Sequence, residues 1–162
     1  MGFRIALCNE VVRALPFAAQ CEFARACGYD GIELAPFTLA DAPDEITASR
    51  AAALGRDAAA AGGAISGLHW LLVAPAGLSL ASEDATVRMR SRDVMLRLID
   101  LCAALGGTYL VHGSPAQRQL PPGVPAARGW GLHFLVVYRM QNIEMLRCPA
   151  GRKLCWTMPT RA

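Results

Sequence analysis

Four short apolar runs alternate along the chain with three segments of helical periodicity. The apolar runs are 3–8 (FRIALC), 32–35 (IELA), 65–70 (ISGLHW) and 108–114 (TYLVHGS). The helical segments are 16–28, 47–61 and 82–107, and glycine ends or directly follows each of them. Short buried strands that alternate with helices pack as a parallel sheet with right-handed crossovers. The order of these segments therefore predicts an α/β fold.

Local signals place the ends of the helices. Pro16 opens the first helical segment, where proline suits the first turn. Ser82 is the expected N-cap of the third segment, with Glu83 and Asp84 in its first turn. An apolar stripe follows at helical spacing: Val87, Val94, Leu98, Leu101, Cys102 and Leu105. We expect this stripe to pack against the sheet.

Neither G-x-G-x-x-G nor G-x-x-x-x-G-K-[ST] follows the first apolar run. This favours a barrel over an open nucleotide-binding sheet. A complete (β/α)8 barrel takes about 250 residues and eight strands, whereas the strand and helix pattern here occupies residues 1–125. We therefore expect a partial (β/α)8 TIM barrel of about four βα units. Such a half barrel has open sheet edges and an uncovered inner face, which favour self-association.

Residues 126–162 differ from the preceding chain in charge. Residues 1–125 hold 10 Arg and 12 Asp and Glu, whereas 126–162 hold six Lys and Arg and one acidic residue, Glu144. One interpretation of this atypical basic tail is a divergent fifth strand, GLHFLVVYR, which contains His133. The other is a stretch translated in a shifted frame and stopped early. The change of charge and the lack of an amphipathic helix after Arg139 favour the shifted frame, and so predict a truncated product.

Polar side chains follow all four predicted strands. In parallel α/β folds, ligands bind at the carboxyl ends of the strands, which together form one rim. The residues placed there are Asn9, Glu10, Glu33, His69, Trp70, His112 and Ser114. Imidazole and carboxylate groups can bind Zn²⁺ or Mn²⁺ or move protons, and an indole can form a wall for a sugar ring. The alternative is that Glu33 faces solvent, the two histidines are core residues and Trp70 is a core or interface aromatic.

Composition limits the class of protein further. Hydrophobic residues make up 54% of the chain and charged residues 18%, which excludes disorder for most of it. Residues 58–82 carry no charge, but glycines and Pro75 interrupt them, so we expect no membrane helix. The six cysteines form no C-x-x-C pair. We therefore expect reduced thiols in a cytoplasmic protein.

Several motifs together resemble a known family. LCNE, FARACGYDGIEL, GLHW and LVHGSP are similar to the N-terminal half of the sugar phosphate isomerase/epimerase family, over about residues 3–123. These are xylose isomerase-like (β/α)8 barrels, related to endonuclease IV-type repair enzymes. The resemblance implies that Glu33, His69 and His112 line the mouth of the active site. In the endonuclease branch, histidines at the ends of strands three and four bind zinc, so the resemblance makes His69 and His112 candidate metal ligands.

The resemblance also implies a chemistry. Sugar isomerases of this family bind one divalent metal (Mn, Mg, Co or Zn) through Glu, Asp, His and Glu of the later strands, and two of those carboxylates transfer protons next to a carbonyl. None of these four positions is identified here, so we expect the chain to be inactive by itself and to bind no metal firmly. The expected substrate of the family is a small sugar or hydroxy-carbonyl compound.

Two alternatives to an isomerase stay open. One is a non-catalytic fragment or self-associating half barrel. The other is an abasic-site nuclease, which the net negative charge of residues 1–125 disfavours because DNA binding requires basic side chains.

Overall fold

The computed structural model describes residues 4–112, 116–120 and 122–125. Ser114, His133 and the whole segment 126–162, with its predicted strand GLHFLVVYR, lie outside the described residues. The two interpretations of the tail therefore stay predictions.

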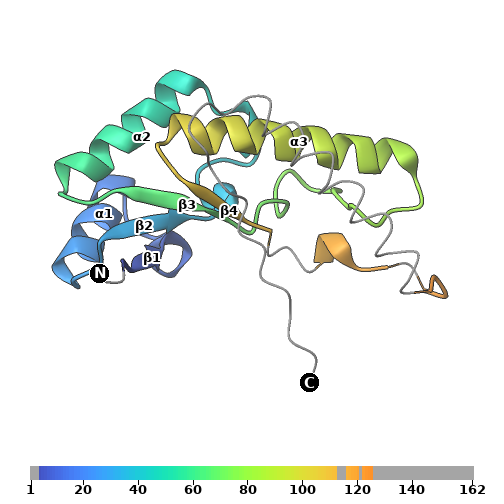
Figure 1. Ribbon diagram of the computed structural model, residues 1–162, viewed down its shortest axis with the longest axis horizontal. Coiled ribbons are helices and arrows are strands. Elements are labelled where there is room, and N and C mark those ends of the chain that lie inside the picture. The colour runs from blue at the N-terminus through green and yellow to red at the C-terminus, as the bar shows by residue number, and fades with distance from the viewer. Residues whose placement is uncertain (1–3, 113–115, 121, 126–162) are drawn as a thin grey trace.

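Four parallel strands form the sheet, as predicted (Figure 1). They are β1 (Ala6–Cys8), β2 (Gly31–Leu34), β3 (Ile65–His69) and β4 (Tyr109–Val111), and they lie side by side in sequence order. Sequential neighbours joined by helical crossovers are the arrangement of one side of a βα barrel. The α/β class and the partial barrel are both confirmed.

Three helices connect the strands and lie on one side of the sheet. They are α1 (Phe17–Ala26), α2 (Ala48–Ala60) and α3 (Ala85–Ala104). Figure 1 shows α2 and α3 running along the same side of the strands, and each helix contacts its neighbour in the chain. Short 3-10 turns follow β1 and β2: η1 (Asn9–Val12), η2 (Pro36–Thr38) and η3 (Pro43–Glu45). A last turn, η4 (Ala116–Arg118), follows β4.

The predicted start of α3 was wrong by two residues. Asp84, not Ser82, is the N-cap, and its carboxylate accepts a hydrogen bond of 2.7 Å from the Thr86 amide. Ser82 instead accepts a hydrogen bond from the amide of Asp84 at 3.2 Å. The first turn of α3 carries no acidic residue, because Glu83 and Asp84 both precede it.

The hydrophobic core lies between the sheet and the helices. Leu34, Leu68 and Leu98 are completely buried there. The predicted apolar stripe of α3 supplies much of the helix side, with Val94, Leu98, Leu101 and Cys102 all buried. The uncharged residues 58–82 divide into the end of α2, β3 and a loop. Within the described parts of the chain, no helix has the length and apolarity that a membrane crossing needs.

The other face of the sheet carries the polar side chains. Cys8 of β1 is in register with Glu33 of β2, Glu33 with Gly67 of β3, and Gly67 with Tyr109 of β4. Because side chains alternate along a strand, this row points away from the buried leucines. Of the helices that the structure describes, none covers this face. A β-carbon at position 67 would clash with the backbone carbonyl oxygen of Tyr109 and would lie 2.7 Å from its ring, so glycine allows this close approach of β3 and β4.

Candidate functional site

Two predicted rim residues, Glu33 and His69, meet at the carboxyl edge of the sheet. The Nδ1 atom of His69 lies 3.2 Å from the Oε2 atom of Glu33, and its Nε2 atom lies 2.8 Å from the Oε2 atom of Glu10. The imidazole therefore lies between two carboxylates from different elements. Only 8% of the His69 side chain is exposed, so these contacts are largely shielded from water. The two carboxylates hold the ring in one orientation.

Cys8 extends this cluster toward β1. Its thiol donates a hydrogen bond of 3.2 Å to the Oε2 atom of Glu33, the same oxygen that faces His69. Burial, followed by the hydrogen bond to Glu33 and the charges of Glu33 and Glu10, raises the pKa of the Cys8 thiol to about 11. Cys8 is therefore a protonated thiol at neutral pH, not a nucleophile. The ligand atoms of Cys8, Glu33 and His69 all lie within 4.8 Å of one another, a spacing that fits a metal ion.

Asn9 has a structural position rather than one on the rim where the sequence placed it. It is completely buried, and its Oδ1 atom accepts a hydrogen bond of 2.8 Å from the amide of Ala35. Its amide group donates to Thr38 Oγ1 at 2.6 Å and to Gln20 Oε1 at 3.3 Å. These bonds connect the end of β1 to the end of β2 and to α1. Asn9 thereby fixes the turn that carries Glu10.

Tyr109 of β4 lies at the end of the polar row opposite to Cys8. Its hydroxyl donates to Ser66 Oγ at 3.1 Å, and Ser66 donates in turn to the carbonyl of Ile32 at 3.2 Å. Burial, and the neighbouring Glu33 carboxylate, raise the pKa of Tyr109 to about 12 against an opposing effect of the Ser66 hydrogen bond. Tyr109 is therefore a neutral hydrogen-bonding group throughout the physiological range of pH.

Trp70 lies directly after β3 and remains 43% exposed. Its φ angle is +52°, a left-handed conformation that is rare for a bulky residue. Its ring is tilted by 32° against that of Phe37, with 6.1 Å between the ring centres. Because Phe37 follows β2, the two aromatic residues lie at the same edge of the sheet as His69. Residues held in such a backbone conformation occur often at functional sites.

His112 follows β4 and is half-buried, and both of its ring nitrogens are shielded from solvent. It is not a member of the group formed by Cys8, Glu33 and His69. Thus the structure brings together two of the four predicted pocket residues, Glu33 and His69. Trp70 is adjacent in the chain to that pair, and His112 occupies the next strand end.

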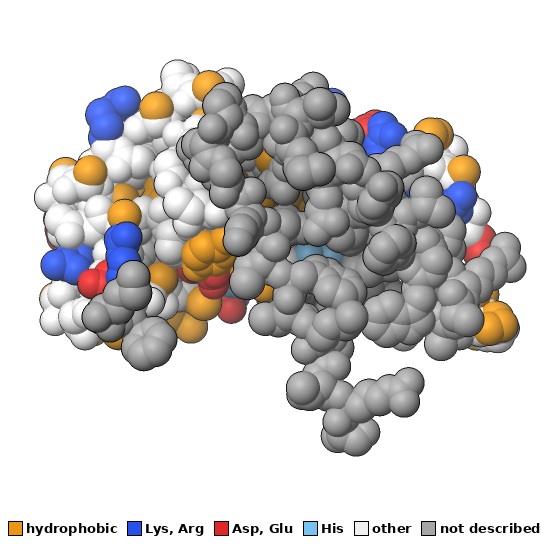
Figure 2. All heavy atoms as spheres, in the orientation of Figure 1, with side chains coloured by type: hydrophobic (Ala, Val, Ile, Leu, Met, Phe, Trp, Pro, Cys, Tyr) orange, Lys and Arg blue, Asp and Glu red, His pale blue; other side chains and the backbone are white. Residues whose placement is uncertain are grey.

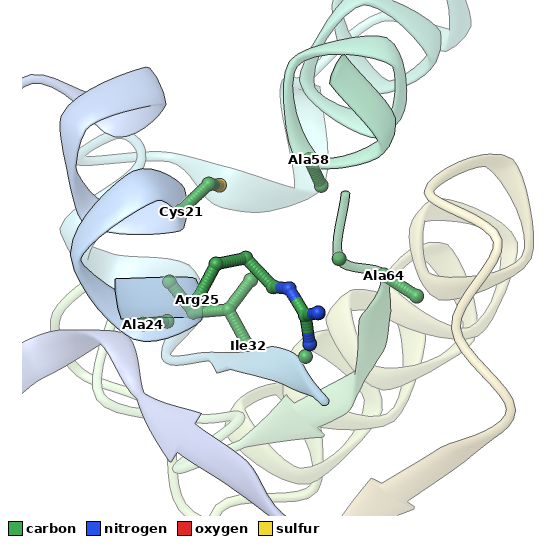
Figure 3. A pocket seen from close by; sticks show the side chains of 8 residues that line it. Cys21, Ala24, Arg25, Ile32, Ala58 and Ala64 are labelled. Atoms are coloured by element: carbon green, nitrogen blue, oxygen red, sulfur yellow. The ribbon is translucent and has the colours of Figure 1, made fainter. Parts of the chain in front are cut away.

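A small cavity lies at the opposite end of the sheet. Its volume is about 10 Å³, and its walls include Cys21, Ala24 and Ala58. Figure 3 shows the Arg25 side chain reaching from α1 toward Ala64. A space of this size holds about one water molecule at most. The cavity is therefore a packing defect at the amino ends of the strands, not a ligand site.

Among the described residues that are visible in Figure 2, basic side chains do not gather into a patch. Basic and acidic groups occur together at both ends of this view. Nucleic acid binding needs several basic side chains gathered on one surface.

The sequence reasoning missed Cys8 and Tyr109 as members of the polar row, and Ser66 as the hydrogen-bond partner of Tyr109. Cys8 was treated as an ordinary thiol, although it precedes Asn9 by one position. The signal that could have found it is the alternation of side chains in neighbouring strands. Glu33 stands between the buried residues Ile32 and Leu34, and the register pairs it with Cys8.

Comparison with protein families identifies the class of this chain. A family model described as the xylose isomerase-like TIM barrel matches residues 21–133, so the chain belongs to that family. No curated protein matches the chain.

Solved structures agree with this fold. One is D-psicose 3-epimerase in the presence of D-fructose, with 18% identity and a TM-score of 0.71 over 94% of this chain and 51% of the other. Another is the apo form of 3-keto-D-glucoside 4-epimerase from E. coli, with 10% identity and a TM-score of 0.66 over 90% of this chain and 53% of the other. The chain thus spans about half the length of these structures. At sequence identities of 18% and 10%, this similarity shows a shared fold only.

Proposed function

We propose that the described strands form part of the sugar-binding mouth of an isomerase or epimerase that moves a proton next to a carbonyl. The observation that supports this best is the contact between Glu33 and His69, 3.2 Å apart at the carboxyl edge of the sheet. This is the edge at which βα barrels hold their substrates. Membership in the xylose isomerase-like family agrees with the proposal.

The roles proposed for these residues are to bind and orient the substrate. The Glu33 carboxylate can accept a hydrogen bond from a sugar hydroxyl, and His69 is already oriented by Glu10 at 2.8 Å. The exposed ring of Trp70 can cover the apolar C–H face of a sugar. His112 would contact the substrate from β4. A buried hydrogen-bonding cluster beside an exposed aromatic ring is suited to a molecule that has both polar and apolar faces.

A divalent cation in this family would stabilise the negative charge of an enediolate intermediate. The resemblance places its main ligands, and the proton-transferring carboxylates, on later strands. We therefore propose substrate binding by this chain, without turnover. The neighbouring structures are named as epimerases of psicose and of a keto-glucoside, so the proposed ligand is a ketose or keto-glycoside.

The test is sugar binding by the complete chain, measured by saturation-transfer NMR with D-fructose and D-psicose. We expect signal transfer to the sugar protons, and its loss in the variant Trp70→Ala. The matched control is Phe23→Ala, because Phe23 is 45% exposed and Trp70 43%, and Phe23 lies on α1. Absence of transfer in the wild-type chain would refute sugar binding. Turnover of either sugar with Mn²⁺ or Co²⁺ would refute the assignment of binding alone.

Three further expectations from the sequence stay proposals: a boundary near residue 125, self-association through the sheet face that none of the described helices covers, and a cytoplasmic location. Self-association is tested by sedimentation equilibrium. A monomer at all concentrations would contradict it.

A further inference from the structure

We propose that Cys8, Glu33 and His69 bind a zinc ion through Sγ, a carboxylate oxygen and Nδ1, with Glu10 orienting the histidine. This site uses the first three strands, whereas the resemblance places the metal ligands of sugar isomerases on later strands. It does not depend on sugar binding, because the metal can be titrated without sugar.

The distances within the cluster are close to those of a zinc site. Zn–S bonds of about 2.3 Å and Zn–N and Zn–O bonds of about 2.0–2.2 Å in a tetrahedron separate ligand atoms by roughly 3.3–3.7 Å. Cys8 Sγ and His69 Nδ1 each lie 3.2 Å from Glu33 Oε2. All three ligand atoms are within 4.8 Å of one another. Small side-chain rotations, together with release of the Cys8 thiol proton to solvent as the Zn–S bond forms, would let the three atoms surround an ion.

The hydrogen bonding of His69 leaves one ring nitrogen for a metal. Glu10 faces Nε2 at 2.8 Å, and a carboxylate at this distance requires that Nε2 carry the proton. In the neutral ring, Nδ1 then presents a lone pair toward Glu33. It lies 3.2 Å from Oε2 and makes no hydrogen bond of acceptable geometry, although it is buried. A cation between these two atoms would replace their repulsion by two bonds.

The Glu10 contact is also the one that metal-binding histidines commonly make. A histidine that binds zinc through one nitrogen donates its other N–H to a carboxylate or carbonyl, which fixes the tautomer and the ring plane. In this chain Glu10 is in position to do so before any metal arrives. Glu33 contacts the opposite nitrogen, so the two carboxylates have different roles.

The ligand types select the metal. Thiolate and imidazole ligands together favour zinc or cobalt over magnesium and calcium, which prefer oxygen. Three protein ligands also leave a fourth tetrahedral position, as in zinc sites that bind an exchangeable molecule. A competing account of the same geometry is a protonated His69 that forms ion pairs with both carboxylates. That account predicts no metal binding at this cluster.

The experiment is a titration of the reduced, complete chain with Zn²⁺ by calorimetry and with Co²⁺ by absorption spectroscopy. We expect tight binding at Cys8 and a thiolate-to-cobalt charge-transfer band in the near ultraviolet. The variant Cys8→Ser should lose that band. The matched control Cys27→Ser should keep it, because Cys27 is an exposed cysteine outside the cluster.

A second variant separates metal binding from folding. Glu10→Gln keeps the size of the side chain and should weaken Zn²⁺ binding by about 10- to 100-fold, as loss of a histidine's carboxylate partner does. The control Glu22→Gln changes an exposed carboxylate on α1 and should leave the affinity unchanged. Circular dichroism of each variant verifies the fold. Full-strength Zn²⁺ binding and an unchanged cobalt band in Cys8→Ser would overturn the proposal, as would the absence of metal binding in the wild-type chain.

Discussion

Replacing Asn9 by alanine should destabilise the fold by about 2–4 kcal/mol. The Oδ1 atom of Asn9 is the acceptor for the amide of Ala35, at 2.8 Å, and both residues are completely buried. A buried donor left without its acceptor costs about 1–3 kcal/mol. The lost donation to Thr38, at 2.6 Å, adds about 1 kcal/mol. For a domain with a total stability of about 5–15 kcal/mol this is a large part.

The assay is equilibrium unfolding in urea, followed by circular dichroism, on the wild-type chain and Asn9→Ala. The control Thr38→Val removes only one partner of the Asn9 amide. Since Thr38 also donates to the carbonyl of Ala35 at 2.7 Å, we expect this control to cost about 1–2 kcal/mol. A change of less than about 0.5 kcal/mol in Asn9→Ala, the range of ordinary surface substitutions, would refute the reasoning.

Three further predictions concern other parts of the fold. Asp84→Ala should destabilise α3 by about 1 kcal/mol in the same unfolding assay, and more than Ser82→Ala, because Asp84 is the N-cap; equal losses would contradict this. Gly67→Ala should cost about 1–3 kcal/mol, because the new methyl group would clash with the backbone carbonyl oxygen of Tyr109 and would lie 2.7 Å from its ring; an unchanged unfolding midpoint would contradict this. Burial, with smaller effects of nearby acidic groups, raises the pKa of Cys21 to about 11. We expect iodoacetamide at pH 8 to modify the exposed Cys27 and to leave Cys21 largely unmodified. Cys21 should react faster as the pH rises toward 11. Peptide mass mapping measures the labelling of each cysteine, and equal labelling at pH 8 would contradict this.

The alternation of strands and helices was predictable because buried parallel strands and amphipathic helices have different periods. The three helices and the strands β1, β3 and β4 lie within their predicted segments, whereas β2 begins at Gly31, one residue before its predicted start, and ends at Leu34, one residue before its predicted end. The N-cap of α3 was not predictable in the same way. Ser82 and Asp84 are both good capping residues, and the sequence does not say which adopts the extended backbone before the helix. In the structure Asp84 does, with φ −72° and ψ 116°.

The candidate site was predictable at the level of strand ends but not of individual contacts. Glu33 and His69 were expected at one edge because parallel strands end together. Their direct contact also depends on the irregular register between β2 and β3, where Ile32 pairs with Ile65 but Glu33 pairs with Gly67. No local signal in the sequence reports such a shift.

Asn9 shows the reverse case. A polar residue after a strand looks like a rim residue in the sequence, because its buried partners are distant in the chain. Ala35 lies 26 positions away and Thr38 lies 29 positions away. Only the packed fold shows that the side chain of Asn9 connects the end of β1 to the end of β2 and to α1.

The position of β1 at one side of the described sheet gives Cys8 a particular sensitivity to motion. In this sheet β1 pairs only with β2, through three residues, whereas β2 and β3 have a neighbour on each side. A short edge strand opens more readily than the strands beside it. Slow exchange of the Cys8 thiol with an added disulfide reagent would therefore measure the detachment of β1 while the core of Leu34 and Leu68 stays folded. A metal bound by Cys8, Glu33 and His69 would link three strands, so β1 could detach only after the metal dissociates from Cys8.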